Sequence, residues 1–250
     1  MIHFLFGILG AVFGSFFNVV IYRLPRKNLS INVPRRSFCP YCGHELSWKD
    51  NIPVFSYLML RGTCRYCGEN ISPRYPVVES LTMLSFVVNS VFFPFYQSLS
   101  LCLISSGLII ISFIDIEKMI IPDTGLILTG IGAAMFSYLR NDWPGILIQA
   151  VIVFGLMIVF YLFANHFKKD SFGFGDVELF AVLTLSLGFI GILFTIMLSS
   201  IIALMTFIII KVAKSEKIKL DYRVPFGPFI ALAGYLTIFF LDGIRNLYSL

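Results

Sequence analysis

The stretch LCLISSGLIIISFID, residues 101–115, carries no charged side chain until it ends on an acid, Asp115. A second stretch, GFGDVELFAVLTLSLGF at residues 173–189, has Asp176 near its start, ahead of an apolar run. A carboxylate beside hydrocarbon is costly, so an acid retained there is a functional-site hypothesis by default. Two carboxylates brought together at a membrane face could share one proton and activate a water molecule, as in an aspartic protease.

Composition predicts an all-α polytopic membrane protein. Only 13% of the 250 residues are charged and 58% are hydrophobic, whereas about a quarter of a soluble domain is charged. A helix needs about 20 apolar residues to cross the hydrocarbon core. The apolar runs give eight candidate helices, at residues 2–22, 77–95, 98–115, 120–139, 143–164, 175–190, 191–211 and 225–244. The sixth is the least distinct, because only Gly188 separates it from the seventh.

The distribution of Lys and Arg predicts the orientation, because cytoplasmic loops are enriched in both residues. Segment 23–76 is rich in basic residues and is therefore predicted to be cytoplasmic, with the N-terminus and the C-terminus outside. Tracing eight helices from there leaves only Arg140 and Arg245 outside, among 19 basic residues. The same tracing puts Asp115 and Asp176 at the cytoplasmic face. The net charge of +5 then reflects topology and contact with anionic lipid, and it gives no case for nucleic acid.

Segment 23–76 contains Cys39-Pro-Tyr-Cys42-Gly and Cys64-Arg-Tyr-Cys67-Gly. Two C-x2-C pairs, each followed by a turn glycine, are typical of a tetrahedral zinc site. The alternative is two disulfides, which a cytoplasmic location disfavours because thiols stay reduced there. Four cysteine ligands leave no open position on the metal, so the predicted zinc is structural. A segment too short for a sizeable core commonly needs such a metal.

The sequence resembles bacterial type IV prepilin peptidases, also called prepilin leader peptidase/N-methyltransferases, over nearly its whole length. Beside the two cysteine pairs, the resemblance rests on GSFFNVVIYRLP at 14–25, SPRYPVVE at 72–79, DIEKMIIPD at 115–123 and GFGD at 173–176. GFGD alone would be weak, but the motifs together and in this order are specific. The resemblance implies a GxGD-type aspartic protease of the bacterial inner membrane.

The resemblance further implies the substrate. Members of the family remove the basic leader of type IV prepilin or pseudopilin precursors, cutting after a Gly at the cytoplasmic face. They then methylate the new N-terminal residue with S-adenosylmethionine. By motif, Asp115 and Asp176 carry over as the catalytic pair, one accepting a proton from water and the other donating to the scissile carbonyl oxygen. The alternative is that both acids cap helices. Asp123 ranks behind Asp115, because an acid in the first turn of a helix is explained by the helix dipole.

Three polar residues border the cysteine segment: Asn18, Arg23 and Glu79. They are the candidate cofactor-binding residues for methyl transfer, where Glu79 could hold the new amine or accept its proton. The alternative, equally open, is a polar cluster that ties the cysteine segment to the helices. No glycine-rich nucleotide loop follows a strand, so methyl transfer rests on the resemblance.

The expected organisation is a first membrane helix at 1–22, a cytoplasmic zinc module at 23–76 and a peptidase bundle at 77–250. Two other classes of function stay open. One is an ion-coupled transporter that uses Asp115 and Asp176 as a relay, although such acids usually lie near the bilayer midplane. The other is a non-catalytic scaffold of a secretion apparatus, which leaves both acids unexplained.

Overall fold

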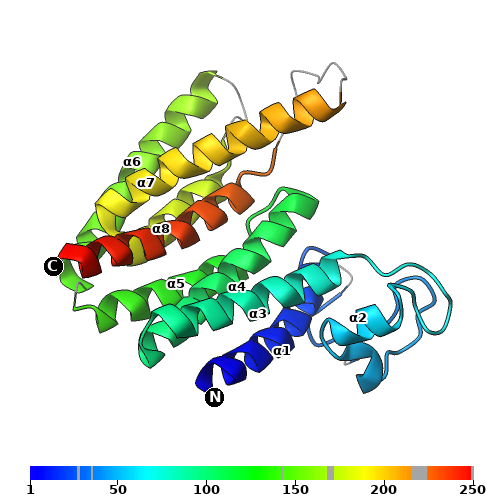
Figure 1. Ribbon diagram of the computed structural model, residues 1–250. Coiled ribbons are helices and arrows are strands. Elements are labelled where there is room, and N and C mark those ends of the chain that lie inside the picture. Colours follow the sequence, from blue (N-terminus) through cyan, green and yellow to red (C-terminus); the bar gives the residue numbers. More distant parts are fainter. Residues whose placement is uncertain (27–28, 35, 142, 168–171, 215–223, 249–250) are drawn as a thin grey trace. The chain divides into compact units, whose positions relative to one another are not determined.

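The computed structural model describes residues 1–250 except 27–28, 35, 142, 168–171, 215–223 and 249–250. Its elements, shown in Figure 1, are α1 (Ile2–Arg23), η1 (Trp48–Asn51), α2 (Phe55–Met59), α3 (Arg74–Phe92), α4 (Phe95–Lys118), α5 (Asp123–Leu139), α6 (Trp143–Phe167), α7 (Phe174–Lys214) and α8 (Gly227–Tyr248). The basic residues of the orientation prediction that lie outside the described residues are Lys27, Arg35, Lys168, Lys169, Lys217, Lys219 and Arg223.

Five of the described helices are long and apolar enough to cross a membrane, judged by length and composition. They are Ile2–Arg23, Arg74–Phe92, Phe95–Lys118, Pro144–Phe167 and Phe174–Ala213. Two further apolar helices, Asp123–Leu139 and Gly227–Gly243, are shorter. The described residues contain isolated β-bridges but no strand. The predicted all-α polytopic fold is therefore confirmed.

Helix α7 is interrupted at Gly188, whose φ of 67° and ψ of −178° are not helical. A positive φ is accessible to glycine because it has no Cβ. The break frees the backbone N–H of Phe189, which donates to the Gln149 side-chain oxygen of α6 at 2.7 Å. The sequence predicted two helices that meet at Gly188, and the break lies at that residue.

Two compact units make up the chain, Met1–Ile110 and Ile111–Leu250. In the first unit, α1 packs along α3 (Figure 1). A Cβ at Gly10 would lie 2.7 Å from the Met83 Cα, and a Cβ at Gly14 would lie 2.7 Å from the Glu79 Cα. Gly10 and Gly14 form a G-x-x-x-G motif, in which small residues let two membrane helices approach closely. The close approach puts Glu79 directly against α1.

In the second unit, α7 packs against α5, α6 and α8. A Cβ at Gly234 of α8 would lie 2.8 Å from the Leu183 Cδ1 of α7, so these two helices also meet at a glycine. Arg140, which follows α5, forms an ion pair with Asp242 of α8. The end of α5 and the later part of α8 therefore lie at the same end of this unit.

Candidate active site and metal centre

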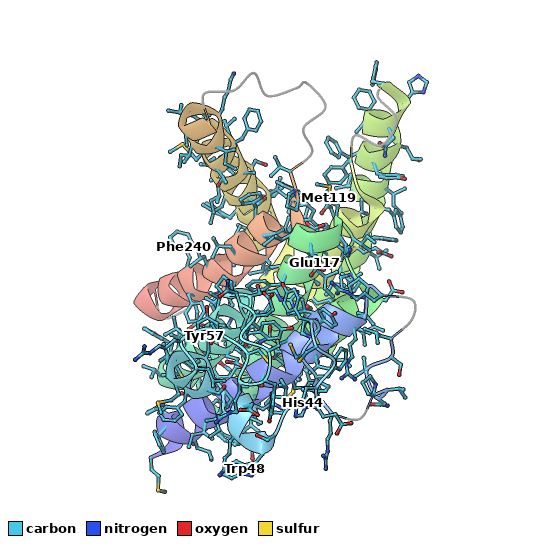
Figure 2. All side chains as sticks on the ribbon, turned by 90° about the vertical axis from the view of Figure 1, so that its right-hand side faces the viewer. His44, Trp48, Tyr57, Glu117, Met119 and Phe240 are labelled. Atoms are coloured by element: carbon cyan, nitrogen blue, oxygen red, sulfur yellow. The ribbon has the colours of Figure 1, made fainter. Side chains whose placement is uncertain are left out.

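Asp115 lies in the last turn of α4 and is only 6% exposed. The helix ends just beyond it, where Met119 adopts a φ of 54° and donates its N–H to the Asp115 carbonyl oxygen at 2.8 Å. Figure 2 labels Glu117 and Met119 at this helix end. The link that follows reaches Pro122, whose extended backbone starts α5 at Asp123. The motif DIEKMIIPD thus folds as a helix end, a short link and a helix start.

The Asp115 carboxylate has a partner from a distant part of the chain. The backbone N–H of Gly227, the first residue of α8, donates to its Oδ2 at 2.9 Å, and the bond is buried. The first N–H groups of a helix have no partner inside the helix. Asp115 therefore caps α8, in addition to any chemical role.

Asp176 lies in the first turn of α7 and is partly buried. A backbone hydrogen bond joins Gly173 to its carboxylate. The preceding residue Phe172 is held by the Asn165 side chain of α6, through bonds of 3.2 and 3.3 Å. A Cβ at Gly175 would lie 2.8 Å from the Ile121 Cβ, so this glycine lets the link after α4 rest on the start of α7.

These contacts bring the two acids of the prediction together. Ile121, six residues after Asp115, packs against Gly175, the neighbour of Asp176, so both acids lie at one end of the second unit. Asp123 begins α5, eight residues after Asp115. Neighbouring carboxyl groups can hold one proton between them, which allows one to act as a base and the other as an acid.

The sulfur atoms of Cys39, Cys42, Cys64 and Cys67 lie within 4.8 Å of one another. Zinc bonds of about 2.3 Å in a tetrahedron put sulfurs about 3.8 Å apart. The Cys39 and Cys67 sulfurs are 3.8 Å apart, and all four cysteines are free thiols. The cluster fits one zinc ion.

The two cysteine pairs are built alike. In each pair, the backbone N–H of the glycine after the second cysteine donates to the backbone carbonyl oxygen of the first cysteine. These bonds run from Gly43 to Cys39 and from Gly68 to Cys64, both at 2.9 Å. Gly43 and Gly68 have φ values of 71° and 75°, which explains the glycine after each C-x2-C. Hydrogen bonds from the backbone of Cys67 and Tyr66 lower the pKa of the Cys64 thiol to about 7.

Asp50 braces this module. Its carboxylate accepts from the Arg65 Nε at 2.8 Å and from the Tyr66 hydroxyl at 3.1 Å. Burial raises the pKa of Asp50, but hydrogen bonds from Ser47, Arg65 and Tyr66 outweigh it and lower the pKa to about 2. The His44 ring stacks on Tyr66 with centroids 3.6 Å apart. Figure 2 labels His44 in this module, with Trp48 and Tyr57.

Of the three candidate cofactor residues, Arg23 and Asn18 bind the backbone of the module and its flank. The Arg23 guanidinium donates to the carbonyl oxygens of Ile31 at 2.9 Å and Arg36 at 3.0 Å, and also to those of Ser30 and Pro34. Asn18 donates to the Tyr75 carbonyl oxygen at 3.0 Å. Its own Oδ1 is buried and has no hydrogen-bond partner among the described residues. The contacts of Arg23 are those of a residue that ties the module to α1.

Glu79, the third candidate, is 7% exposed and lies in α3. Its Oε2 accepts the backbone N–H of Val54 at 2.7 Å, and it also bonds to the Ser15 hydroxyl. Val54 has a φ of 61°, which is unusual for a β-branched residue, so Glu79 holds a strained backbone in place.

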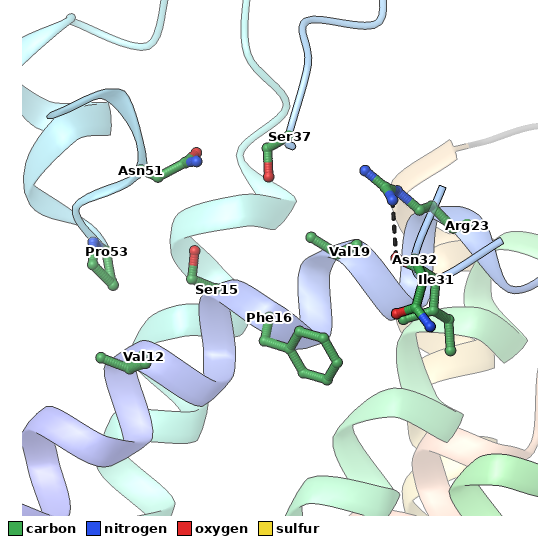
Figure 3. Close-up of a pocket in the computed structure, with 10 residues that line it drawn as sticks. All are labelled: Val12, Ser15, Phe16, Val19, Arg23, Ile31, Asn32, Ser37, Asn51 and Pro53. Atoms are coloured by element: carbon green, nitrogen blue, oxygen red, sulfur yellow. Dashed lines mark hydrogen bonds between the residues drawn. The ribbon is translucent and has the colours of Figure 1, made fainter. Parts of the chain in front are cut away.

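A pocket of about 680 Å³ lies between α1 and the module (Figure 3). Its lining residues are Val12, Ser15, Phe16, Val19, Arg23, Ile31, Asn32, Ser37, Asn51 and Pro53. It combines apolar side chains of α1 with hydroxyl and amide groups, as ligand sites in proteins do. Two lining residues connect the pocket to Glu79: Ser15 is bonded to its carboxylate, and Pro53 precedes its other partner, Val54. This acid therefore borders the pocket.

Sequence reasoning missed three features. The G-x-x-x-G of Gly10 and Gly14 is a recognisable signal in an apolar helix. Gly227 gave no such signal, because a glycine at a helix start does not tell which distant side chain its N–H will meet. The pocket was also missed, since its lining residues come from separate segments.

Comparison with known proteins places both units in one family. The model of the bacterial peptidase A24 N-terminal domain matches residues 8–93. The model of the type IV leader peptidase family matches residues 102–208, which include both aspartates. A comparison with solved structures gives no match.

Curated relatives are similar over nearly their whole length. The prepilin leader peptidase/N-methyltransferase of Vibrio cholerae is 34% identical over 94% of this chain and 95% of its own. The protein of the same name from Pseudomonas aeruginosa is 33% identical over 96% and 91%. The type 4 prepilin-like proteins leader peptide-processing enzyme of Escherichia coli is 32% identical over 92% and 91%. The chain therefore belongs to the type IV leader peptidase family and is an enzyme of the prepilin leader peptidase/N-methyltransferase type.

Proposed function

We propose that this protein removes the basic leader of type IV prepilin-like precursors by cutting after a Gly at the cytoplasmic face of the inner membrane. The observation that carries the proposal is that the buried Asp115, at the end of α4, and Asp176, at the start of α7, lie at the same end of the second unit. Family membership and the names of the relatives support the substrate class. In the proposed orientation both chain termini are outside and residues 23–76 are cytoplasmic.

In the proposed reaction the two aspartates start with one proton between them. The ionised carboxylate takes a proton from water while the water oxygen bonds to the scissile carbonyl carbon. The protonated carboxyl group gives its proton to the carbonyl oxygen. When the carbon–nitrogen bond breaks, the first aspartate passes its proton to the leaving amine, and a hydroxyl proton returns to the second. The enzyme ends in its starting state.

The second proposed activity is methylation of the new N-terminal amine. S-Adenosylmethionine would supply the methyl group, and the pocket beside α1 suits it in size and in its mixture of apolar, hydroxyl and amide groups. Glu79, at the border of the pocket, would attract the substrate ammonium. Asn18 offers a buried oxygen that lacks a partner among the described residues. Arg23 would keep the pocket wall in place through its carbonyl contacts.

Structural zinc completes the proposal. Cys39, Cys42, Cys64 and Cys67 would hold one ion, whose role is to fix the module that forms one wall of the pocket. The proposal thus assigns methylation to the module of residues 23–76 with the helices that flank it. Cleavage is assigned to the helix bundle that follows.

The test is the mass of a precursor after incubation with the purified protein in detergent. Loss of the leader is expected, together with a gain of about 14 Da on the new N-terminus when S-adenosylmethionine is present, the mass of one added methyl group. A transporter or a scaffold would leave the precursor intact, so an unchanged mass would refute the proposal. Leader loss without the added mass would support the peptidase and refute the methyltransferase.

A further inference from the structure

We infer that Gly227 is a positioning residue for cleavage: its backbone N–H fixes the ionised Asp115 carboxylate, which makes Asp115 the general base and Asp176 the general acid. The inference rests on the proposed peptidase activity and assigns the two roles that the proposal leaves open. In this inference the start of α8, in the segment VPFGPF, positions a catalytic carboxylate.

The hydrogen bond between Gly227 and Asp115 is direct and buried. The Gly227 N–H donates to the Asp115 Oδ2 at 2.9 Å, and both residues are buried. A hydrogen bond to a charged group is roughly twice as strong as a neutral one, and a low local dielectric strengthens it further. The N-terminal end of a helix also favours negative charge. The hydrogen bond and the helix end stabilise the ionised form of Asp115 against the cost of burying its charge.

The position requires glycine because of the same carboxylate. A Cβ at residue 227 would lie 2.8 Å from the Asp115 Oδ2 and 3.2 Å from its Cγ. Real Cβ atoms do not approach other atoms so closely, so either the carboxylate or the helix start would have to move. A side chain at this position and the present hydrogen bond therefore exclude one another.

Packing fixes α8 where the N–H meets the acid. Phe226, just before the helix, contacts the Phe180 ring of α7, and Gly234 meets Leu183 of the same helix. Asp176, Phe180 and Leu183 are spaced i, i+4 and i+7, so they share one face of α7. The face that holds α8 in place is thus the face that carries the second acid.

The surroundings of Asp176 are different. Its backbone partner Gly173 is exposed, whereas Gly227 is buried, so the bond to Gly173 competes with solvent and contributes less. The charged residues nearest in sequence to the two acids are Glu117 and Lys118 at the end of α4 and Glu178 of α7, and Asp123 begins α5. Because the buried Gly227 bond stabilises the charge of Asp115 more than the exposed Gly173 bond stabilises that of Asp176, Asp176 is the acid that keeps the proton.

Two variants test the inference by steady-state cleavage of a full-length precursor in detergent. Gly227→Ala adds the clashing Cβ, and glycolic acid incorporated at 227 replaces only the N–H by an oxygen. Each should lower kcat about 10- to 100-fold, the size of one lost charged hydrogen bond, with a smaller change in KM. The matched control is Gly243→Ala in the same helix, where a Cβ meets no atom within 4 Å.

The pH profile separates positioning from mere structural damage. Without the N–H, the Asp115 carboxylate ionises less readily, so the acidic limb of kcat should move to higher pH. A structural defect would lower kcat equally at every pH. If the glycolic acid variant keeps the wild-type kcat and acidic limb, the inference is wrong, even if Gly227→Ala fails to fold. If the wild-type protein itself does not cleave, the proposed function fails instead.

Discussion

Glu79 and Asp115 are both buried acids, and each accepts one backbone N–H from a distant segment. Glu79 receives it from Val54 at 2.7 Å, and Asp115 receives it from Gly227 at 2.9 Å. Glu79 has a hydroxyl group, Ser15, as its further partner, whereas Asp115 shares its end of the second unit with another acid, Asp176. A lone acid with satisfied contacts can hold a loop, but proton transfer in both directions needs a pair. Burial alone therefore does not identify the catalytic acid.

Removing the zinc should have the largest effect, and it should act on the Glu79 side of the comparison. A structural zinc site contributes on the order of 10 kcal/mol to its module, so a strong chelator should unfold residues 23–76. Methylation should be lost, and cleavage should fall less. Elemental analysis and limited proteolysis measure the two events. Cys102→Ser is the control, because Cys102 lies in α4 among Phe6 and Phe86. Metal-free protein with two disulfides, prepared under reducing conditions, would contradict the zinc assignment.

Removing the charge of Asp115 or of Asp176 should lower cleavage and leave methylation unchanged. Asp115→Asn and Asp176→Asn should each lower the cleavage rate about 100- to 10,000-fold, the usual contribution of general acid–base catalysis. Methylation of a precursor that has already been cut should continue. Asp123→Asn, in the next helix, is the control and should keep substantial activity. Near-wild-type cleavage by either variant of the pair would show that the assignment is wrong.

The reciprocal change is Glu79→Gln, which keeps an oxygen for the Val54 N–H but removes the charge. A charged hydrogen bond contributes about 1.5–3 kcal/mol, so methylation should fall about 10- to 100-fold. Cleavage should stay near the wild-type rate. The two reactions are followed by the mass of the product from one precursor. Equal loss of both activities would assign Glu79 to the fold or to a shared substrate pocket.

The smallest expected effect tests how α1 holds Glu79 in place. Gly14→Ala puts a Cβ 2.7 Å from the Glu79 Cα, so α1 and α3 must separate. Overpacking of this kind costs about 1–3 kcal/mol, which unfolding in mixed detergent can measure. Gly155→Ala in α6 is the control, because a Cβ there meets no atom within 4 Å. If both variants are equally stable, the contact of α1 with α3 is looser than the structure has it.

Much of the fold follows from local sequence. Runs of apolar residues specify helices because every backbone polar group in a bilayer must bond within its own segment. The break at Gly188 and the turns at Gly43 and Gly68 follow from the positive φ that glycine accepts. The cysteine spacing predicted the cluster, since four ligands on two tight turns can surround one ion.

The helices, the turns and the residue types of both sites can be read from the order of residues along the chain. The tertiary structure alone decided their partners: Gly227 for Asp115, Val54 for Glu79, and four carbonyl oxygens for Arg23. The physical reason is that a helical period tells which residues share a face but not which face of another helix it will meet. The glycines Gly14 and Gly234 let α1 approach α3 and α8 approach α7 closely, which fixes the faces that meet. The hydrogen bonds between distant segments then follow from this packing.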